Sequence, residues 1–266
     1  MDNNTENRTP ILNIAWSRFA QLDAAAEKLE NPHYGIRRWI FILGVFASLF
    51  AVLTEVYPDD FPAVGKIVIK VLLILSPITA SVLAAFFNKF YGGGGWLTLR
   101  AGAEEIKKEI FMYRTVLKDD PRRRIWLEKR LAEIHRQVFR GLGGEMALDT
   151  YTGIIPPYHD PNNPESDSGF HDLGGDEYFK FRLSDQLAWH IRKVNKIQVE
   201  RTRLQWAILI AGALGSVFAA LGGAFSLWVA VAASVAAAFI GWTELKNLDD
   251  TLKNYSKVVI ELMIIY

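Results

Sequence analysis

The sequence contains no cysteine, which excludes disulfide bonds and thiolate metal sites and suits a protein that faces the cytoplasm. Carboxylates are also scarce within its apolar stretches, where Glu55, at the end of one stretch, is the exception. A proton-coupled transporter usually needs an intramembrane Asp, Glu or His. No nucleophile and base stand out as a pair either. We therefore expect neither proton coupling nor enzymatic activity, and we expect no cofactor and no metal.

What the sequence has instead is four long apolar runs in two hairpins. They cover residues 39–56, 67–87, 204–221 and 224–242. At about 1.5 Å per residue, a helix of this length crosses a hydrocarbon core of about 30 Å. The sequence therefore predicts an all-α membrane protein with four transmembrane helices, a helical cytoplasmic domain and a C-terminal heptad helix.

The placement of charge predicts the orientation of these helices. Apart from Lys66 and Lys70, the 30 Lys and Arg residues lie in the N-terminal segment, the long middle segment or the C-terminal tail. The first hairpin tip carries Asp59 and Asp60, and the second is little more than two glycines. The positive-inside rule then places both termini and residues 88–203 in the cytoplasm. We expect a multi-pass protein of the bacterial inner membrane, N-in and C-in.

The chain divides into five segments by composition and periodicity. These are an N-terminal amphipathic cytoplasmic helix (1–36), transmembrane hairpin 1 (37–89), a cytoplasmic helical region (90–203) with an irregular loop (141–176), transmembrane hairpin 2 (204–242) and a C-terminal cytoplasmic heptad helix (243–266).

The first segment has an apolar stripe at helical spacing over residues 11–30. The stripe comprises Leu12, Ala15, Trp16, Phe19, Leu22 and Leu29. Its polar face is mixed rather than basic, which favours packing on the cytoplasmic helices over lying on the membrane. Two more helices with apolar spacings of three and four residues follow over residues 103–117 and 127–138, and we expect them to form an antiparallel hairpin.

Prolines, glycines and serines interrupt residues 141–176, which favours an irregular loop of low order. His159-Asp160 and His171-Asp172 in this loop resemble a pair of divalent-metal ligands. We favour a chance occurrence of these residue types in a polar loop.

The second apolar run is the least uniform of the four. Its polar residues and its proline are Lys70, Ser76, Pro77, Thr79 and Ser81. Lys70 either extends to the outer interface or forms a ring of charge at the outer mouth of a pore. The remaining residues form either a packing kink or a pore bend lined by hydroxyls. If a pore exists, we expect this run to line it.

The second hairpin and the tail carry packing signals. Gly212-x-x-x-Ser216 and Ala233-x-x-x-Ala237-x-x-x-Gly241 allow helices to approach closely inside lipid, within one chain or between chains. The tail repeats apolar residues in a heptad pattern: Leu245, Leu248, Leu252, Tyr255, Val259, Leu262 and Tyr266. We expect the fourth span and the tail to form one rod of about 60 Å from Ala224. The tail packs either on its own chain or around an oligomer axis.

The two halves share one plan, in which an amphipathic helix precedes two spans and a Trp-led helix follows them. The residues that carry the pattern are Trp96, Arg100, Glu104 and Tyr113 in the first half, and Tyr178, Arg182, Gln186, Trp189, Trp242, Glu244 and Tyr255 in the second. In this pattern the chain resembles the SLATT superfamily of bacterial two-span modules, as a tandem pair. His190 departs from the pattern, where an aromatic residue is expected. Arg100 and Glu104 are spaced to form an i,i+4 ion pair, and Glu104 or Glu105 could also reach the basic region around Arg182 and Arg192. We favour a solvated helix surface over both contacts.

The resemblance implies a membrane effector, of a family associated with pore formation in bacterial nucleotide-signalled conflict systems. We expect a homo-oligomeric ion channel or pore-like effector that is gated through its cytoplasmic helices. The alternative is a non-conducting oligomeric scaffold or sensor. The expected partners are the lipid bilayer, further copies of the chain and a separate signalling or sensor protein, with no nucleic acid.

Overall fold

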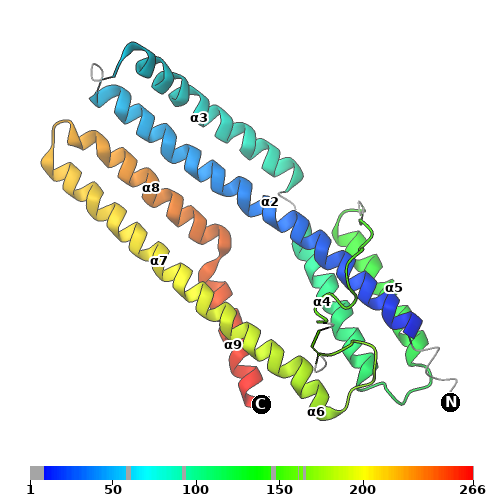
Figure 1. The fold of residues 1–266 in the computed structure, drawn as a ribbon. Coiled ribbons are helices and arrows are strands. Elements are labelled where there is room, and N and C mark those ends of the chain that lie inside the picture. Colours follow the sequence, from blue (N-terminus) through cyan, green and yellow to red (C-terminus); the bar gives the residue numbers. More distant parts are fainter. Residues whose placement is uncertain are drawn as a thin grey trace. The chain divides into compact units, whose positions relative to one another are not determined.

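The structure is a computed structural model that describes residues 9–57, 61–91, 94–144, 148–160, 162–163 and 166–265. Its helices are α2 (Thr9–Val56), α3 (Ala63–Phe90), α4 (Gly95–Arg114), α5 (Arg123–Gly141), α6 (Gly175–Tyr178), the π-helix η1 (Phe179–Ser184), α7 (Asp185–Leu221), α8 (Phe225–Lys246) and α9 (Leu248–Ile265) (Figure 1). These residues contain no strand, and four helices are long and apolar enough to cross a membrane. The predicted all-α membrane fold is confirmed. Asp59, Asp60, Gly92, Gly93 and Tyr266 lie outside the described ranges.

The chain folds as two compact units. The core unit comprises Met1–Pro32 and Tyr91–Asp185, and the span unit comprises His33–Phe90 and Gln186–Tyr266. Helix α2 contributes to both units, because it runs for 48 residues through Pro32 without interruption. The amphipathic segment and the first apolar run, which the sequence divides at residue 36, are therefore parts of one helix.

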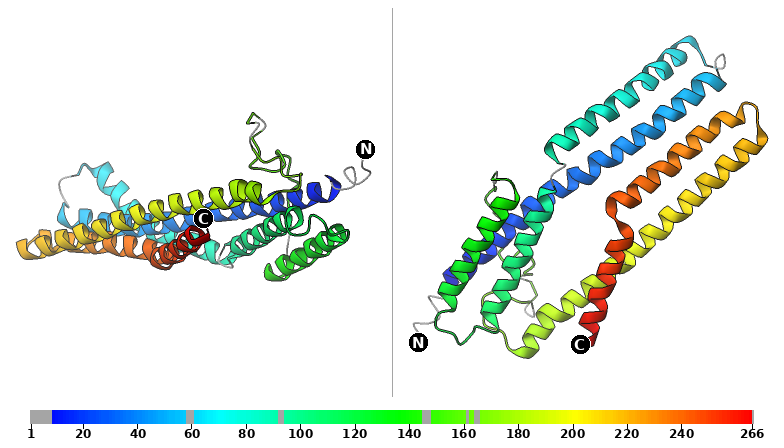
Figure 2. Two further views of the ribbon diagram at one scale, coloured as in Figure 1. Left: turned by 90° about the horizontal axis from the view of Figure 1, so that it is seen from below. Right: turned by 180° about the vertical axis from the view of Figure 1, so that it is seen from behind.

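In the span unit, the apolar helices lie side by side in one layer, in the order α3, α2, α8, α7 (Figures 1 and 2). The contacts follow this order. The ring of Phe87 in α3 lies 4.9 Å from that of His33 in α2, and the hydroxyls of Ser48 in α2 and Ser234 in α8 are hydrogen-bonded at 2.6 Å. Because a single layer has little interior, at most 11% of the most apolar window of any span is buried.

The small residues of the second hairpin are used only in part within the chain. Gly241 of α8 meets the ring of Phe41 in α2, where an added Cβ would lie 2.7 Å from a ring carbon. Gly212 and Ser216 of α7 are exposed, and an added Cβ at Gly212 would meet nothing within 4 Å. Close packing is confirmed at Gly241, whereas the Gly212-x-x-x-Ser216 face stays uncovered in the single chain.

The core unit is built around the amphipathic stripe of α2. Leu12 and Trp16 are 0% exposed and belong to one apolar cluster with Ile106 of α4 and Leu127 of α5. Helices α4 and α5 pack on each other as the expected hairpin. The predicted packing of the N-terminal stripe on neighbouring helices is confirmed.

The predicted single rod from Ala224 to the end of the tail is wrong. Helix α8 ends at Lys246, and Asn247 adopts the left-handed conformation, with φ 44° and ψ 52°, before α9 begins at Leu248. Asn tolerates this conformation better than most residues, because its short polar side chain forms local hydrogen bonds. Here the Asn247 side-chain amide donates to Asp250 at 3.1 Å. The tail therefore leaves α8 in a new direction (Figure 1).

Candidate functional site

A cluster of polar side chains of the span unit lies at one end of the layer, around Trp242. The indole Nε1 of Trp242 donates to the carboxylate of Glu200 at 3.4 Å, and Lys246 Nζ donates to the same oxygen at 2.5 Å. The guanidinium of Arg38 lies 5.7 Å from the centre of the Trp242 ring. Tyr34 meets the same indole edge-on, with ring centroids 6.2 Å apart. We refer to these five residues as the Trp242 cluster.

The chain brings this cluster together because each member lies where an apolar run begins or ends. Arg38 precedes the first run on α2, and Glu200 precedes the third run on α7. Trp242 closes the fourth run on α8, at the boundary depth that indole favours. Lys246 follows one turn later, where a cation also stabilises the C-terminus of a helix. The Trp242 cluster therefore joins α2, α7 and α8 at the same end of their apolar runs.

A groove adjoins the Trp242 cluster along α2, α7 and α8. Its volume is about 510 Å³. Most of its lining is apolar, and its charged members are all in the Trp242 cluster. The lining residues are Arg38, Phe41, Ile42, Val45, Phe46, Glu200, Leu204, Val235, Ala238, Phe239, Trp242 and Lys246. This arrangement can hold a hydrocarbon chain along the apolar wall, with one end of the bound molecule beside the cationic side chains.

Helix α9 packs on α7 within the same chain. The ring of Tyr255 lies 5.7 Å from that of Trp189 and 5.6 Å from that of His190, and Arg201 Nε lies 2.5 Å from an Asp249 carboxylate oxygen. The described heptad positions of the tail are buried or half-buried: Leu245, Leu248, Leu252, Tyr255, Val259 and Leu262. The heptad stripe therefore has a partner within the chain, as in the intramolecular alternative.

In α3, the predicted pore residues lie on different faces. Lys70, Pro77 and Ser81 are spaced by seven and four residues and share one exposed face, whereas Thr79 lies nearly opposite on the same helix. Ser76 is 5% exposed, and its hydroxyl donates to a carbonyl one turn earlier at 2.7 Å. The hydroxyl of Ser81 donates to the carbonyl of Pro77 at 2.9 Å. The run thus presents Lys70 and Ser81 together and turns Ser76 away from them.

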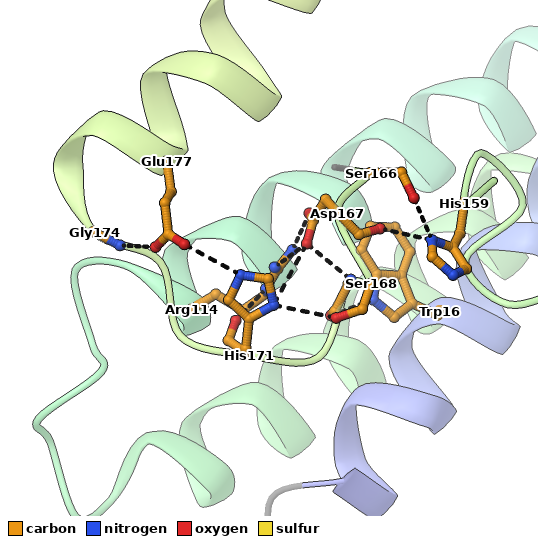
Figure 3. Close-up of polar contacts among 10 residues, drawn as sticks. Trp16, Arg114, His159, Ser166, Asp167, Ser168, His171, Gly174 and Glu177 are labelled. Atoms are coloured by element: carbon orange, nitrogen blue, oxygen red, sulfur yellow. Dashed lines mark hydrogen bonds and ion pairs between the residues drawn. The ribbon is translucent and has the colours of Figure 1, made fainter. Parts of the chain in front are cut away.

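In the core unit, the segment that the sequence predicts to be poorly ordered is anchored by a buried ion pair (Figure 3). The guanidinium of Arg114 donates to both carboxylate oxygens of Asp167, at 2.7 and 2.5 Å. The indole of Trp16 donates to the carbonyl of Gly169 at 2.9 Å. Burial alone would raise the pKa of Asp167, but the hydrogen bonds and charge of Arg114 outweigh it and lower this pKa.

The histidines of the same segment serve its internal hydrogen bonding. His159 Nδ1 lies 3.0 Å from the Ser166 hydroxyl, and His171 Nδ1 lies 3.1 Å from the Ser168 hydroxyl (Figure 3). The described residues contain no group of three or more His, Cys, Asp or Glu side chains placed to hold a metal ion. Asp172, which follows His171, forms an ion pair with Arg123 at 2.8 Å. Both histidines are therefore held by hydrogen bonds within the segment, and Asp172 is held by an ion pair to α5.

Comparison with known protein families gives one match. Residues 178–266 match the SMODS and SLOG-associating 2TM effector domain 1. This segment is a SLATT-family effector domain. It includes the second transmembrane hairpin and α9, together with Glu200, Trp242 and Lys246 of the Trp242 cluster. No curated protein and no solved structure matches the chain.

Within the SLATT domain, the structure brings motif residues from distant parts of the sequence together. Trp189 meets Tyr255, as described above, and Trp242 meets Glu200. His190, the departure from the expected pattern, lies with its Nδ1 2.7 Å from the carbonyl of Gln186, and its ring is tilted against that of Tyr255. These motif positions therefore join α7 to α8 and α9.

The remaining SLATT motif residues of the second half take other positions. Tyr178 and Arg182 both lie on Phe111 of α4, with the Arg182 guanidinium 5.0 Å from the ring centre. Glu244 is exposed, and its carbonyl accepts the N–H of Asn247 at the end of α8.

In the first half, the motif residues lie in the core unit. Arg100 forms its ion pair with Asp23 of α2 rather than with Glu104, and Glu104 is exposed, as expected for a solvated helix surface. Helix spacing allowed the local pair, but Asp23 competes for the guanidinium from a helix packed alongside. Trp96 is half-buried, and Tyr113 is buried beneath the guanidinium of Arg123 at 4.6 Å. The prediction of a tandem pair still rests on the sequence resemblance of the first half to the SLATT superfamily.

Sequence reasoning missed Arg38 as a cluster member, together with Glu200, Lys246, Ser48 and Ser234. The signal for the first three was a charge within one or two turns of the end of an apolar run, close to a tryptophan at the same boundary. The two serines each stand alone in an apolar run, and their pairing across helices has no local sequence signal.

Proposed function

We propose that the chain is a homo-oligomeric membrane effector that forms an ion-conducting pore, gated through its helices outside the bilayer. The single-layer arrangement of the four spans supports this proposal. A layer one helix thick encloses no polar path by itself, so conduction requires several copies arranged around an axis. The SLATT domain supports the effector role.

Self-association is favoured by the surface that the single chain leaves uncovered. Gly212 and Ser216 of α7 are exposed at a spacing that lets membrane helices approach closely. Helix α7 is at one edge of the layer, where a second copy has access to it. Helix α3 forms the opposite edge (Figure 1). Its Lys70 and Ser81 are exposed and share one face by their helical spacing. In a ring of copies, that face of α3 lines the lumen.

The test is conductance of the purified full chain in planar bilayers, with native mass spectrometry for subunit number. Lys70→Glu should shift the reversal potential under an ion gradient, because it inverts a ring of charge at the pore mouth. Lys89→Glu, at the other end of the same helix, is the matched control. Ser81→Trp should block the current more strongly than Thr79→Trp, since Thr79 lies on the opposite face.

A non-conducting scaffold or sensor is the second candidate. It is favoured by the hydroxyls of Ser76 and Ser81, which are bonded to their own helix rather than presented to a lumen. Absence of conductance from a folded oligomer, with and without the separate sensor protein that we expect as its partner, would favour the scaffold. Conductance that neither Lys70→Glu nor Ser81→Trp alters would place the pore away from α3.

A further inference from the structure

The groove beside the Trp242 cluster combines an apolar wall with one charged end. Its wall includes Phe41 and Val45 of α2 and Phe239 of α8, and its charged end is formed by Arg38, Glu200 and Lys246. The α2 side extends from position 38 to position 46, which is about 12 Å at helical rise. This is close to half of a hydrocarbon core of about 30 Å. The groove therefore has the depth of one membrane leaflet.

The charged end favours an anion. Lys246 is held by Glu200 at 2.5 Å, which leaves Arg38 as the excess positive charge of the lining. Among the described residues, no carboxylate lies within ion-pair distance of Arg38, whose guanidinium rests on the Trp242 ring. A guanidinium at membrane-boundary depth, with free donors, matches the geometry of a phosphate group.

We propose that this groove binds one anionic phospholipid. The phosphate is held by Arg38 beside the Trp242 ring, and one acyl chain lies along Phe41, Val45 and Phe239. The volume of about 510 Å³ falls within the range of small-molecule sites. The lipid contacts α2 of the first hairpin and α7 and α8 of the second, so it joins the two hairpins. This inference does not depend on conduction of ions.

A lipid is favoured over other occupants by position. The groove lies along apolar runs, so a water-soluble anion or a peptide would have to enter hydrocarbon to reach it. A second copy of the chain could cover the apolar wall, but the carboxylate that the described helices carry within an apolar run is Glu55, at the opposite end of the first run from Arg38. A phospholipid supplies both the apolar chain and the negative charge from the surrounding bilayer.

The probe is a phosphatidylglycerol that carries a photoreactive diazirine in one acyl chain, and a phosphatidylcholine with the same label is its control. The full chain is reconstituted with either lipid, irradiated, and its labelled peptides are mapped by mass spectrometry. We expect phosphatidylglycerol to label residues 38–46 and 235–242, saturably at one lipid per chain. Phosphatidylcholine should label these peptides at least several-fold less.

Two variants, each with a matched control, separate the contact with the lipid phosphate from the contact with the acyl chain. Arg38→Gln should weaken phosphatidylglycerol binding about tenfold, as expected for loss of a charge-assisted hydrogen bond. Arg203→Gln removes the same charge near the same end of the layer, from an exposed position outside the groove, and should leave binding within about twofold of the parent. Ala238→Phe fills the groove and should remove the labelling, whereas Ala237→Phe, on the exposed neighbour, should not.

Circular dichroism and gel filtration confirm that each variant is folded, so that a lost site is not mistaken for a lost fold. Equal losses from Arg38→Gln and Arg203→Gln would reduce the effect to general attraction at the membrane surface and overturn the proposal. Equal labelling by the two lipids would also overturn the proposal, as would labelling that Ala238→Phe leaves intact. Cross-links between residues 38–46 and 235–242 of different copies, in place of lipid labelling, would assign the groove to a protein contact.

Discussion

Replacing Asp167 by asparagine should open the core unit far more often, because it breaks the buried ion pair with Arg114. The Arg114 side chain is 0% exposed and that of Asp167 is 5% exposed. Removal of one partner from such a pair costs about 3–5 kcal/mol, since the other charge stays buried without compensation. Asparagine keeps one acceptor oxygen for Arg114, so we expect a loss at the lower end of this range, about 3 kcal/mol.

The absence of cysteine from the sequence provides the assay. A single cysteine introduced at Ala103, which is 0% exposed in α4, can react with a thiol reagent only when the core unit opens. A loss of about 3 kcal/mol corresponds to labelling about a hundredfold faster. Asp149→Asn is the matched control, because it removes an ion pair to Lys28 whose side chains are 86% and 75% exposed. That variant should change the labelling rate by no more than about fivefold.

The pH dependence of the labelling rate of Asp167→Asn relative to that of the parent gives an independent check. The pKa of Asp167 is lowered in the folded chain, so its contribution to stability is complete above the unfolded pKa of about 3.9 and is lost as pH falls through the folded value. The difference between parent and Asp167→Asn should therefore shrink below about pH 4. Equal labelling rates for Asp167→Asn and Asp149→Asn at pH 7 would refute the reasoning. The double change Arg114→Met with Asp167→Leu should recover much of the loss, because no charge is then left buried.

Three further predictions concern the close contact at Gly241, the topology and the tail. Gly241→Ala should lower the free energy of unfolding by about 1–3 kcal/mol in denaturant titrations, because the new Cβ meets a phenylalanine ring of α2 at 2.7 Å. For the topology, Asp59→Cys should label with a membrane-impermeant reagent from outside intact cells, and Asp160→Cys only after permeabilisation; the reverse pattern would contradict the N-in, C-in orientation. For the tail, Leu252→Asp should release α9 from α7 in hydrogen exchange, whereas Ile260→Asp, at a position 58% exposed, should reduce only the subunit number in native mass spectrometry if copies meet through α9.

The parts of the fold that the sequence predicts correctly are those with a local signal. The apolar runs are contiguous, and the stripe from Leu12 to Leu22 repeats at helical spacing, so each can be read within a window of a few turns. The burial of this stripe against α4 and α5 also agrees with the mixed charge on the polar face of the same helical segment. The periodicity marks which face is apolar, and the charges indicate that the face packs on protein.

The parts that the sequence does not predict depend on residues far apart or on one backbone angle. Arg114 and Asp167 are separated by 53 positions, so the composition of the loop around Asp167 gives no sign of its anchor. The break at Asn247 depends on one residue with a left-handed backbone conformation. The heptad spacing from Leu245 to Leu248 is the same as in an uninterrupted helix, so the sequence pattern gives no sign of this break. The partner of Arg100 likewise depends on packing, because Asp23 is on α2 and comes within reach only where α2 lies beside α4.

Three of the SLATT motif residues, Trp189, Trp242 and Tyr255, have a common property in this structure: they join the membrane hairpin to the helices that continue from it. Trp189 and Tyr255 hold α9 on α7, and Trp242 with Glu200 holds α8 on the same helix. The extramembrane turns of α7 therefore contact both the end of the fourth span and the tail that follows it. A displacement of these turns would act on the Trp242 cluster first, since Glu200 lies on α7 and its partner Lys246 lies at the end of α8. We therefore expect an effector of this family to respond through the relative position of these three helices, with Glu200→Gln weakening the coupling while leaving the apolar spans in place.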